Sequence, residues 1–568
     1  MQPNQEPPFE WWRRAVVYQI YIRSFADGNG DGIGDIAGIR HRLPYLRDLG
    51  IDAIWITPWY PSPMADGGYD VADYCDIDPQ FGSLADAAEL VREAHELGIR
   101  VLIDLVPNHT SDQHPWFQAA LAGGPGSSER ARYVFADGRG PDGSEPPNNW
   151  PSLFGGPGWI RVTEPDGRPG QWFLHVFAPE QPDLNWDNPV VRRDFEEILA
   201  FWLDRGVDGF RIDVAHAMVK ADGLPDIPAE YLAGERMPDG AHPHWDQPGV
   251  HEIHRAWRRI ADGYEGSRML IGEIGVFDQT RLVDYLRPDE LHAAFNFAYM
   301  GAPWEPEALR AVIDETLEAH RRVAATPTWV LSNHDATRQV TRLGRPYAGI
   351  RNRELDDIQP TDLALGTRRA RAAILLTLAL PGCAYLYQGE ELGLWEVEDL
   401  PEADLQDPIW ERSSHLIRGR DGCRVPLPWA DDAPPFGFGP PGSTPWLPQP
   451  IAWQHRTAES EAHDPGSMLS LYRAALRLRR DHPGFQGGAF RWLPSPAGTL
   501  LFARSDGVHC AVNLSASVMP LPPNREPLVA SLEFDGQALP PDAAAWFRTT
   551  PELSRVQARP GGDLRSHS

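Results

Sequence analysis

Carboxylates, histidines and arginines gather in four short segments, and each segment follows or ends a run of apolar residues. The segments are residues 104–109, 209–213, 272–273 and 333–335. An isolated aspartate after a strand usually caps a turn or a helix, but four such segments in one chain indicate a shared site. Converging carboxylates repel one another unless an arginine compensates and at least one carboxyl keeps its proton. That separation of roles suits glycoside hydrolysis, in which one carboxylate is the nucleophile and another is the acid and then the base.

Eight short runs rich in β-branched and aromatic residues are predicted to be the strands that position these segments. Amphipathic stretches such as residues 84–97 and 190–204 lie between them and predict helices. Eight strand-helix units favour an α/β fold of the (β/α)8 TIM barrel type, whose reactive groups lie at the carboxyl ends of the strands. The predicted strands are residues 16–25, 51–58, 100–107, 209–213, 269–273, 292–297, 328–332 and 383–388.

Two insertions and a change of pattern divide the rest of the chain. The barrel is predicted to cover residues 11–108 and 178–482, with an inserted domain rich in Gly, Pro and Trp at residues 109–177. A second insertion, residues 390–455, follows the eighth strand. From residue 483 to residue 568, short alternating runs predict a C-terminal antiparallel β-sandwich domain.

Composition and charge narrow the classes of partner. The 568 residues carry a formal net charge of −28, which disfavours nucleic acid and anionic membrane surfaces and leaves neutral small molecules as the expected ligands. The four cysteines form no Cys-x-x-Cys pair, and the polar N-terminal segment has no apolar core of a secretory signal. A cytoplasmic location is therefore expected, while the sequence does not indicate an oligomeric state.

Taken together, the four segments resemble the four conserved regions of the α-amylase family, glycoside hydrolase family 13, in order and spacing. Two further segments resemble the oligo-1,6-glucosidase and α-glucosidase branch of that family: Gln181-Pro-Asp-Leu-Asn-Trp186 and Arg420-Asp-Gly-Cys-Arg-Val-Pro. The second departs from the branch at Val425, where Thr or Ser is common. The resemblance extends from about Trp11 to beyond Leu514.

The resemblance implies roles for three carboxylates. Asp213 would be the nucleophile that attacks the anomeric carbon, and Glu273 would be the general acid and then the general base. Asp335 would hold the 2- and 3-hydroxyls of the distorted sugar and stabilise positive charge in the transition state. Arg211 precedes Asp213 by two residues, so it lies on the same strand face and would keep the nucleophile ionised.

The resemblance also implies a pocket that closes around one terminal glucose. Asp70 and Arg420 would clamp its 4- and 6-hydroxyls, which makes the enzyme exo-acting, and Tyr69 would stack on the sugar. The other residues expected to bind the sugar or form the pocket wall are His109, Phe177, His334 and Arg338.

A loop that alternates oxygen donors with glycine follows the first predicted strand. Its donors match the spacing of calcium loops, and the resemblance implies one structural Ca²⁺ or Mg²⁺. The loop lacks the glutamate of an EF-hand, because Gly38 stands at that position, and a Gly/Asp turn without metal is the alternative. Catalysis is expected to need no metal or organic cofactor. The predicted ligands are Asp27, Asn29, Asp31, Ile33 and Asp35.

These observations predict a retaining exo-α-glucosidase acting on short α-glucosides, with some glucosyl transfer to sugar acceptors. One alternative is a relative that rearranges glucosides, such as a trehalose synthase or a sucrose isomerase. A remote alternative is a non-catalytic protein like the heavy chains of amino-acid transporters, which share the barrel but lack the carboxylates and have a membrane span. In the branch that this chain resembles, Val after the nucleophile accompanies α-1,6 activity, so the resemblance implies α-1,6 linkages from Val214. The sequence around Val214 departs from that pattern, so both α-1,4 and α-1,6 substrates remain open.

Overall fold

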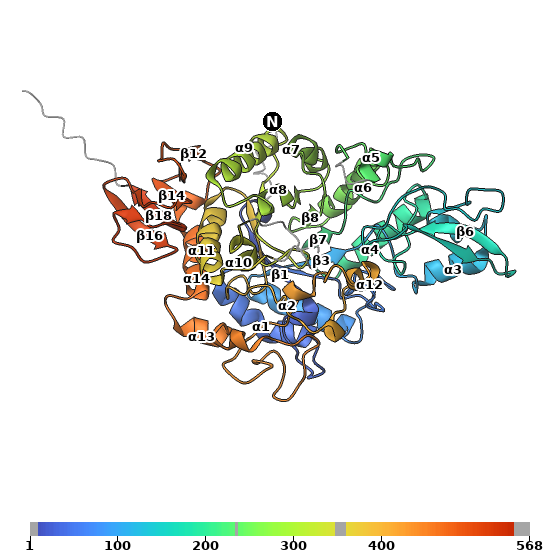
Figure 1. Ribbon diagram of the computed structural model, residues 1–568, viewed down its shortest axis with the longest axis horizontal. Helices are drawn as coiled ribbons and strands as arrows, with labels where there is room; N and C mark the ends of the chain where they lie inside the picture. The colour runs from blue at the N-terminus through green and yellow to red at the C-terminus, as the bar shows by residue number, and fades with distance from the viewer. Residues whose placement is uncertain (1–9, 233–236, 347–358, 550–568) are drawn as a thin grey trace, which may run out of the picture.

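The computed structural model describes residues 10–232, 237–346 and 359–549. Within them, eight parallel strands form a nearly closed barrel (Figure 1), which confirms the predicted fold class. In the order of the sheet, the strands are β10 (Thr328–Val330), β11 (Cys383–Tyr387), β1 (Val16–Ile20), β2 (Ala53–Ile56), β3 (Arg100–Leu105), β7 (Gly209–Ile212), β8 (Met269–Gly272) and β9 (Ala293–Ala294).

Successive residues of the barrel strands face alternately the barrel interior and the surrounding helices. In β1, Tyr18 belongs to the large core under the helices, whereas Val17 belongs to a smaller apolar cluster inside the barrel. Trp55 of β2 and Leu102 of β3 join that inner cluster. Because side chains along a strand repeat every two residues, Asp104 faces inward like Leu102, one layer closer to the carboxyl end. This alternation directs the polar residues at the strand ends toward one space.

Helices cover the outside of the barrel. Asp35 caps α1 (Ile36–Leu49), and Ser83 and Asp86 form a capping box on α2 (Leu84–Glu96), so local sequence determines where both helices begin. None of the helices described is long and apolar enough to cross a membrane. The other helices around the barrel are α4 (Pro189–Leu203), α5 (Ala229–Leu232), α6 (Val250–Asp262), α7 (Gln279–Leu282), α8 (Phe297–Met300), α9 (Pro306–Arg322), α10 (Gln339–Leu343), α11 (Leu363–Ala379) and α14 (Met468–Asp481).

All eight barrel strands are shorter than the predicted runs, and for two of them the structure shows the reason. The run 16–25 leaves the sheet after Ile20, because residues 22–24 form a 3-10 turn. The run 292–297 contributes only the two residues of β9, since α8 begins at Phe297. Among the described residues, β9 and β10 share no backbone pairing; the Thr328 hydroxyl donates to the Ala294 carbonyl there instead.

The first insertion contains α3 (Pro115–Gly123) and a three-stranded antiparallel sheet in the order β4 (Phe135–Ala136), β6 (Pro169–Leu174) and β5 (Trp159–Thr163). The second insertion contains α12 (Pro408–Arg412), and α13 (Ala458–His463) follows it. The Arg412 guanidinium donates to the Gly155 carbonyl, so the two insertions meet each other.

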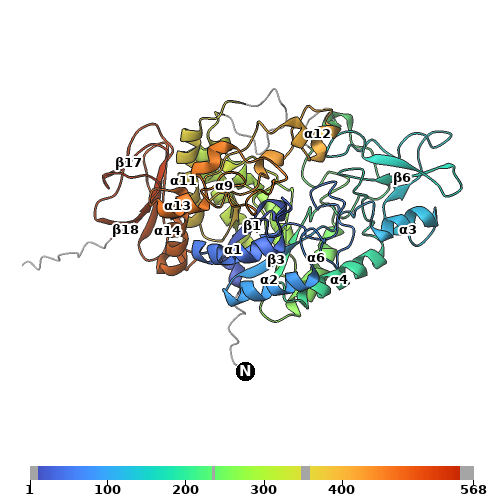
Figure 2. The ribbon, with the colours of Figure 1, turned by 90° about the horizontal axis from the view of Figure 1, so that it is seen from below.

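Antiparallel strands form the C-terminal part of the described chain. Leu501 and Phe547 of the larger sheet pack with Met519 and Leu539 of the smaller one, and the Trp546 indole bonds to a carbonyl of α11 at 2.9 Å. Figures 1 and 2 show these sheets and the first insertion at opposite ends of the molecule. Residues 550–568 of the predicted domain lie outside the described residues. The larger sheet has the order β12 (Arg491–Trp492), β13 (Thr499–Ala503), β14 (Val508–Asn513), β18 (Ala543–Thr549) and β16 (Arg525–Ala530), and the smaller one pairs β15 (Met519–Pro520) with β17 (Ala538–Leu539).

Candidate active site

A cavity of about 540 Å³ lies at the carboxyl ends of the barrel strands. Its lining comes from strand ends and from both insertions, and its volume suits a small ligand. Most of the predicted site residues are brought together here. Those that line the cavity are Tyr69, His109, Phe177, Asp213, Glu273, His334, Asp335 and Arg420.

Arg211 lies beneath the cavity and joins three carboxylates. Its Nη1 donates to Asp104 at 2.9 Å and to Asp213 at 2.6 Å, while its Nη2 donates to Glu273 at 2.6 Å. The guanidinium is fully buried, and its central carbon lies 4.9 Å from the centre of the Trp55 ring. Because a guanidinium is planar and rigid, it fixes Asp213 and Glu273 as neighbours at one place in the cavity.

The backbone after Asp213 adds a second donor to Glu273. The Val214 N–H lies 3.1 Å from the Glu273 carboxylate. Val214 has a φ of 34°, which is unfavourable for a β-branched residue and is found where surrounding structure enforces it. The strained turn thus directs this N–H toward Glu273.

The shared guanidinium carries one positive charge against three carboxylates, and this affects the protonation of the two aspartates. Burial raises the pKa of Asp213 well above its ordinary value of 3.8; the charges of Glu273 and Asp104 add to this increase and Arg211 opposes it. Burial likewise raises the pKa of Asp104 to about 6, again opposed by Arg211. Asp213 and Asp104 therefore keep their protons at a pH where separate aspartates would be ionised.

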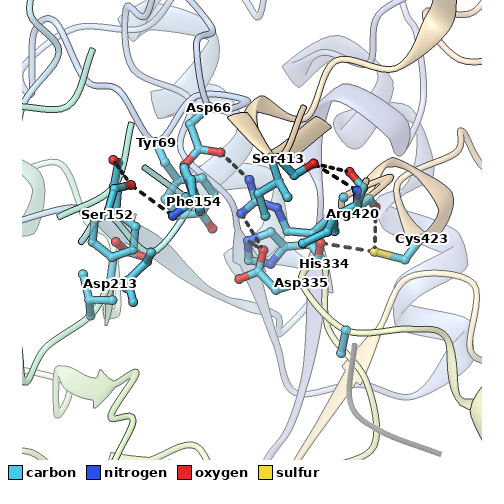
Figure 3. A pocket seen from close by; sticks show the side chains of 18 of the residues that line it. Asp66, Tyr69, Ser152, Phe154, Asp213, His334, Asp335, Ser413, Arg420 and Cys423 are labelled. Carbon is cyan, nitrogen blue, oxygen red and sulfur yellow. Dashed lines mark hydrogen bonds and ion pairs between the residues drawn. The ribbon is translucent and has the colours of Figure 1, made fainter. Parts of the chain in front are cut away.

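Arg420 forms a second centre of charge. Its Nη2 lies 2.5 Å from Asp66, its Nη1 lies 3.1 Å from Asp335, and its Nε donates to Asp407 at 2.6 Å. Arg424 also donates to Asp335, at 3.0 Å. Burial alone would raise the pKa of Asp407, but the charges of Arg420 and Arg424 hold it below its ordinary value. Figure 3 shows the Arg420 side chain between Asp66 and Asp335, in the wall of the cavity.

The predicted pairing of Asp70 with Arg420 is wrong: the partner is Asp66. Asp70 is fully buried, is not among the residues that line the cavity, and accepts the backbone N–H groups of Ala65 and Asp66 at 2.9 and 3.0 Å. Both of its oxygens are therefore used to form the turn that presents Asp66. Asp66 and Asp70 lie on either side of Gly67 and Gly68 in the sequence. The conformation of the turn decides which of the two side chains reaches the cavity.

Arg338 is not part of the cavity wall either, so that prediction is also wrong. Its guanidinium donates to the carbonyls of Gln388 and Cys423 at 2.9 and 2.8 Å. Cys423 lines the cavity, and Arg338 lies behind it. Arg338 therefore supports the wall through the backbone that it binds.

The two predicted histidines lie close to Tyr69. The His334 ring is stacked on the Tyr69 ring at 5.2 Å, and its Nδ1 lies 2.6 Å from the Gln19 amide nitrogen. Burial lowers the pKa of His334 well below its ordinary value and lowers that of His109 to about 4. Both rings are therefore neutral near pH 7. Since Gln19 occupies Nδ1 of His334 as a donor, its Nε2 carries the proton and can donate to a sugar hydroxyl.

Four residues of this arrangement were not predicted as site residues. Asp66 and Asp407 hold Arg420, Asp104 holds Arg211, and the Phe154 ring lies 5.1 Å from the Arg420 guanidinium carbon. Asp104 could have been predicted from the sequence, because it stands near the end of a strand at a position whose side chain faces the barrel interior. Asp407 and Phe154 belong to the insertions, where no periodic pattern indicates the direction of a side chain.

The loop predicted to bind a cation is held together by its own hydrogen bonds. Asp27 accepts the N–H groups of Gly30 and Gly32, and Asp35 accepts those of Gly28, Asn29 and Gly38. Among the described residues, no group of three or more acidic, histidine or cysteine side chains is arranged to hold a metal ion. The carboxylates thus satisfy backbone donors in this arrangement, and the cation stays a prediction.

Metal analysis tests that prediction directly. If the loop binds Ca²⁺, protein dialysed without chelator retains about one equivalent, and EDTA lowers the melting temperature by several degrees through loss of binding energy. Asp31→Ala removes an exposed predicted ligand and should abolish both effects, whereas Asp48→Ala on the exposed end of α1 should change neither. If the protein contains no metal, and neither EDTA nor added Ca²⁺ changes its melting temperature, the loop is a Gly/Asp turn without metal.

Comparison with known proteins places the chain in a family. The alpha-amylase catalytic domain matches residues 19–488. A probable alpha-glucosidase of Rhizobium meliloti is 38% identical over 551 residues, covering 92% of this chain and 93% of that protein. An oligo-1,6-glucosidase of Parageobacillus thermoglucosidasius is 36% identical over 83% of this chain and 84% of its own length.

Solved structures agree with this placement. An alpha-glucosyl transfer enzyme matches with a TM-score of 0.82 and 36% identity, over 96% of this chain and all of that one (100%). The trehalulose synthase of Pseudomonas mesoacidophila MX-45 matches with a TM-score of 0.82 and 30% identity, over 95% of this chain and 100% of its own. The chain belongs to the alpha-amylase family, and it is a glycoside hydrolase. Within that family it is similar to α-glucosidases and oligo-1,6-glucosidases, as the sequence motifs predicted.

Proposed function

We propose that the protein is a retaining, exo-acting α-glucosidase that removes the terminal non-reducing glucose from short α-glucosides. The proposal rests on one observation: the Arg211 guanidinium donates hydrogen bonds to both Asp213 and Glu273. The ion pair of Arg420 with Asp66 lines the same cavity and would bind the hydroxyls at the end of the sugar chain. Maltose-type and isomaltose-type substrates both fall within the proposal.

In the proposed reaction, Glu273 donates a proton to the glycosidic oxygen while Asp213 attacks C1. The bond from C1 to that oxygen breaks, the alcohol leaves, and a β-glucosyl ester forms on Asp213. Water then gives a proton to Glu273, and its oxygen attacks C1 to release α-glucose and the Asp213 carboxylate. A sugar hydroxyl in place of water gives glucosyl transfer. Asp335, held by Arg420 and Arg424, would bind the ring hydroxyls as positive charge develops.

Two displacements at C1 predict that the configuration is retained. Proton NMR of 4-nitrophenyl α-glucoside hydrolysis in its first minutes should therefore show α-glucose, before mutarotation produces the β-anomer. Initial rates with maltose and isomaltose measure which linkage is cleaved faster. β-Glucose as the first product would contradict the role of Asp213 as nucleophile.

The raised pKa of Asp213 predicts an unusual acid limb of the pH profile. The nucleophile must be ionised, so kcat/KM should fall as the pH drops through a pKa well above the ordinary value of 3.8. Asp104→Asn removes a negative charge that contributes to this increase, so it should shift the acid limb to lower pH. Asp52→Asn changes a carboxylate that bonds to Val16 at the other end of the barrel and should leave the limb in place. An acid limb that Asp104→Asn does not shift would contradict this coupling.

A glucoside-rearranging activity is the second candidate, favoured by the similarity to a trehalulose synthase over 95% of the chain. Such an enzyme returns both sugars of sucrose in one product instead of releasing them. Chromatography of the products from sucrose separates the two activities, because hydrolysis gives glucose and fructose in equal amounts. An isomeric disaccharide as the main product would favour rearrangement.

We also infer a cytoplasmic location. The four cysteines, Cys75, Cys383, Cys423 and Cys510, are all free thiols, which supports a reducing compartment. Fractionation of the source cells followed by activity measurement tests this inference.

A further inference from the structure

The turns that follow Asp213 and Glu273 are bonded to each other beyond the ends of their strands. β7 and β8 pair as far as Ile212 and Gly272, and the Glu273 N–H then donates to the Ile212 carbonyl at 2.9 Å. The Ala215 N–H donates to the Glu273 carbonyl at 2.8 Å. These bonds fix the backbone at Glu273, while the turn that follows Glu273 is held by a side chain.

That side chain is His216, whose Nδ1 accepts the Gly275 N–H at 3.3 Å. An imidazole nitrogen accepts a hydrogen bond only when it carries no proton. Burial lowers the pKa of His216 below its ordinary value of 6.5, although the charges of Glu273 and Asp246 oppose this. The ring is therefore neutral near pH 7, with its proton on Nε2, and the turn after Asp213 is bonded to the backbone on both sides of residue 274.

The His216 ring is confined by its neighbours. A Cβ on Gly275 would lie 2.8 Å from Nε2 of the ring, so the ring rests directly on the glycine backbone. The Trp245 ring lies 6.0 Å from the His216 ring, and the Asp246 N–H donates to the His216 carbonyl at 2.7 Å. The residue is only 7% exposed. Its ring is therefore held in one place against the turn that follows Glu273.

We infer that His216 is a positioning residue for Glu273, because its ring holds the turn after Glu273 against the turn after Asp213. This inference rests on the proposed function, which takes Asp213 as the nucleophile and Glu273 as the proton donor. His216 does not line the cavity, so it acts through Glu273 and not on the sugar. A retaining reaction needs the two carboxyl groups about 5–5.5 Å apart, and a small displacement of a proton donor slows its transfer strongly.

Two aryl α-glucosides that differ in the acidity of their leaving group test the position of Glu273. 4-Nitrophenolate can depart without a proton, whereas the more basic phenolate needs one from the general acid. We name the kcat/KM for 4-nitrophenyl α-glucoside divided by that for phenyl α-glucoside the leaving-group ratio. His216→Ala should raise this ratio about tenfold. His216→Asn should keep it within about threefold of the wild type, because the amide oxygen can replace Nδ1 as the acceptor.

Two further variants separate positioning from a loss of stability. Gly275→Ala displaces the His216 ring from the other side of the contact and should also raise the leaving-group ratio. His320 is a buried histidine of α9, and its Nδ1 lies 2.9 Å from the Thr316 carbonyl. His320→Ala should therefore lower the melting temperature and leave the ratio unchanged. An unchanged ratio in His216→Ala would overturn the inference.

Glu273→Ala distinguishes a failure of this inference from a failure of the proposed function. Loss of the general acid itself should raise the leaving-group ratio about 100-fold or more. If Glu273→Ala leaves the ratio unchanged, Glu273 is not the proton donor, and the proposed function fails together with the inference. If Glu273→Ala raises the ratio and His216→Ala does not, the proposed function stands and the positioning role of His216 is wrong.

Discussion

Replacing Asp213 by alanine is expected to lower kcat/KM for 4-nitrophenyl α-glucoside by about 10⁴-fold or more, since loss of a nucleophile removes the covalent path. The structure holds this carboxylate by one bond of 2.6 Å from Arg211, and Arg211 keeps its bonds to Asp104 and Glu273 in the variant. The variant should therefore fold. Steady-state kinetics and a thermal unfolding curve measure both effects.

Azide provides the control for this variant. A small anion can enter the space that the carboxylate leaves and attack C1 from the same side, while nitrophenolate departs. The product should be β-glucosyl azide, because only one displacement takes place. Recovery of turnover with azide shows that the rest of the site is intact. Substantial hydrolysis of the glucoside by pure Asp213→Ala without azide would exclude Asp213 as the nucleophile.

The fold was predictable where side chains repeat with a local period. Parallel strands buried on both faces give continuous apolar runs, and helix caps such as Asp35 and Ser83 are sequence signals in their own right. The strand ends could be read in the same way, because Asp104, Arg211 and Asp213 follow the alternation of their strands. The length of the weakest strand, β9, was overestimated. Its contact with β10 is a hydrogen bond from the Thr328 hydroxyl, not a ladder of backbone hydrogen bonds.

The site was less predictable where it depends on pairings between distant loops. Arg420 and Asp66 are separated by 354 residues in the sequence, and no local period relates them. Asp407 lies only 13 residues before Arg420, but it stands ahead of a short helix as an ordinary capping residue would. The Arg420–Asp66 contact arises because the second insertion reaches a loop of the barrel, whereas the Arg420–Asp407 contact lies within that insertion. A motif identifies such residues as important but does not fix which acid meets which arginine.

Asp66→Asn is expected to lower kcat/KM for maltose by about 100-fold or more, because it removes one member of a buried charge pair that would also bind the sugar. Asparagine keeps the volume of the side chain but cannot offer two charged acceptors to Arg420 and to the glucose hydroxyls. A 4-deoxyglucosyl substrate should lose much less on this substitution than the parent substrate, since the hydroxyl proposed to bind Asp66 is absent. The resulting double-mutant cycle measures the contact itself.

Asp70→Asn gives the contrasting result that separates the two acids. Asp70 accepts two backbone N–H groups, so an amide there places a donor against a donor and should lower the melting temperature by about 2–4 °C. Its kcat/KM should fall by less than about tenfold, because the residue shapes the turn and does not line the cavity. The 4-deoxy substrate should lose as much as the parent in this variant. If Asp70→Asn rather than Asp66→Asn removed the discrimination between the two substrates, the acid that binds the terminal glucose would be Asp70.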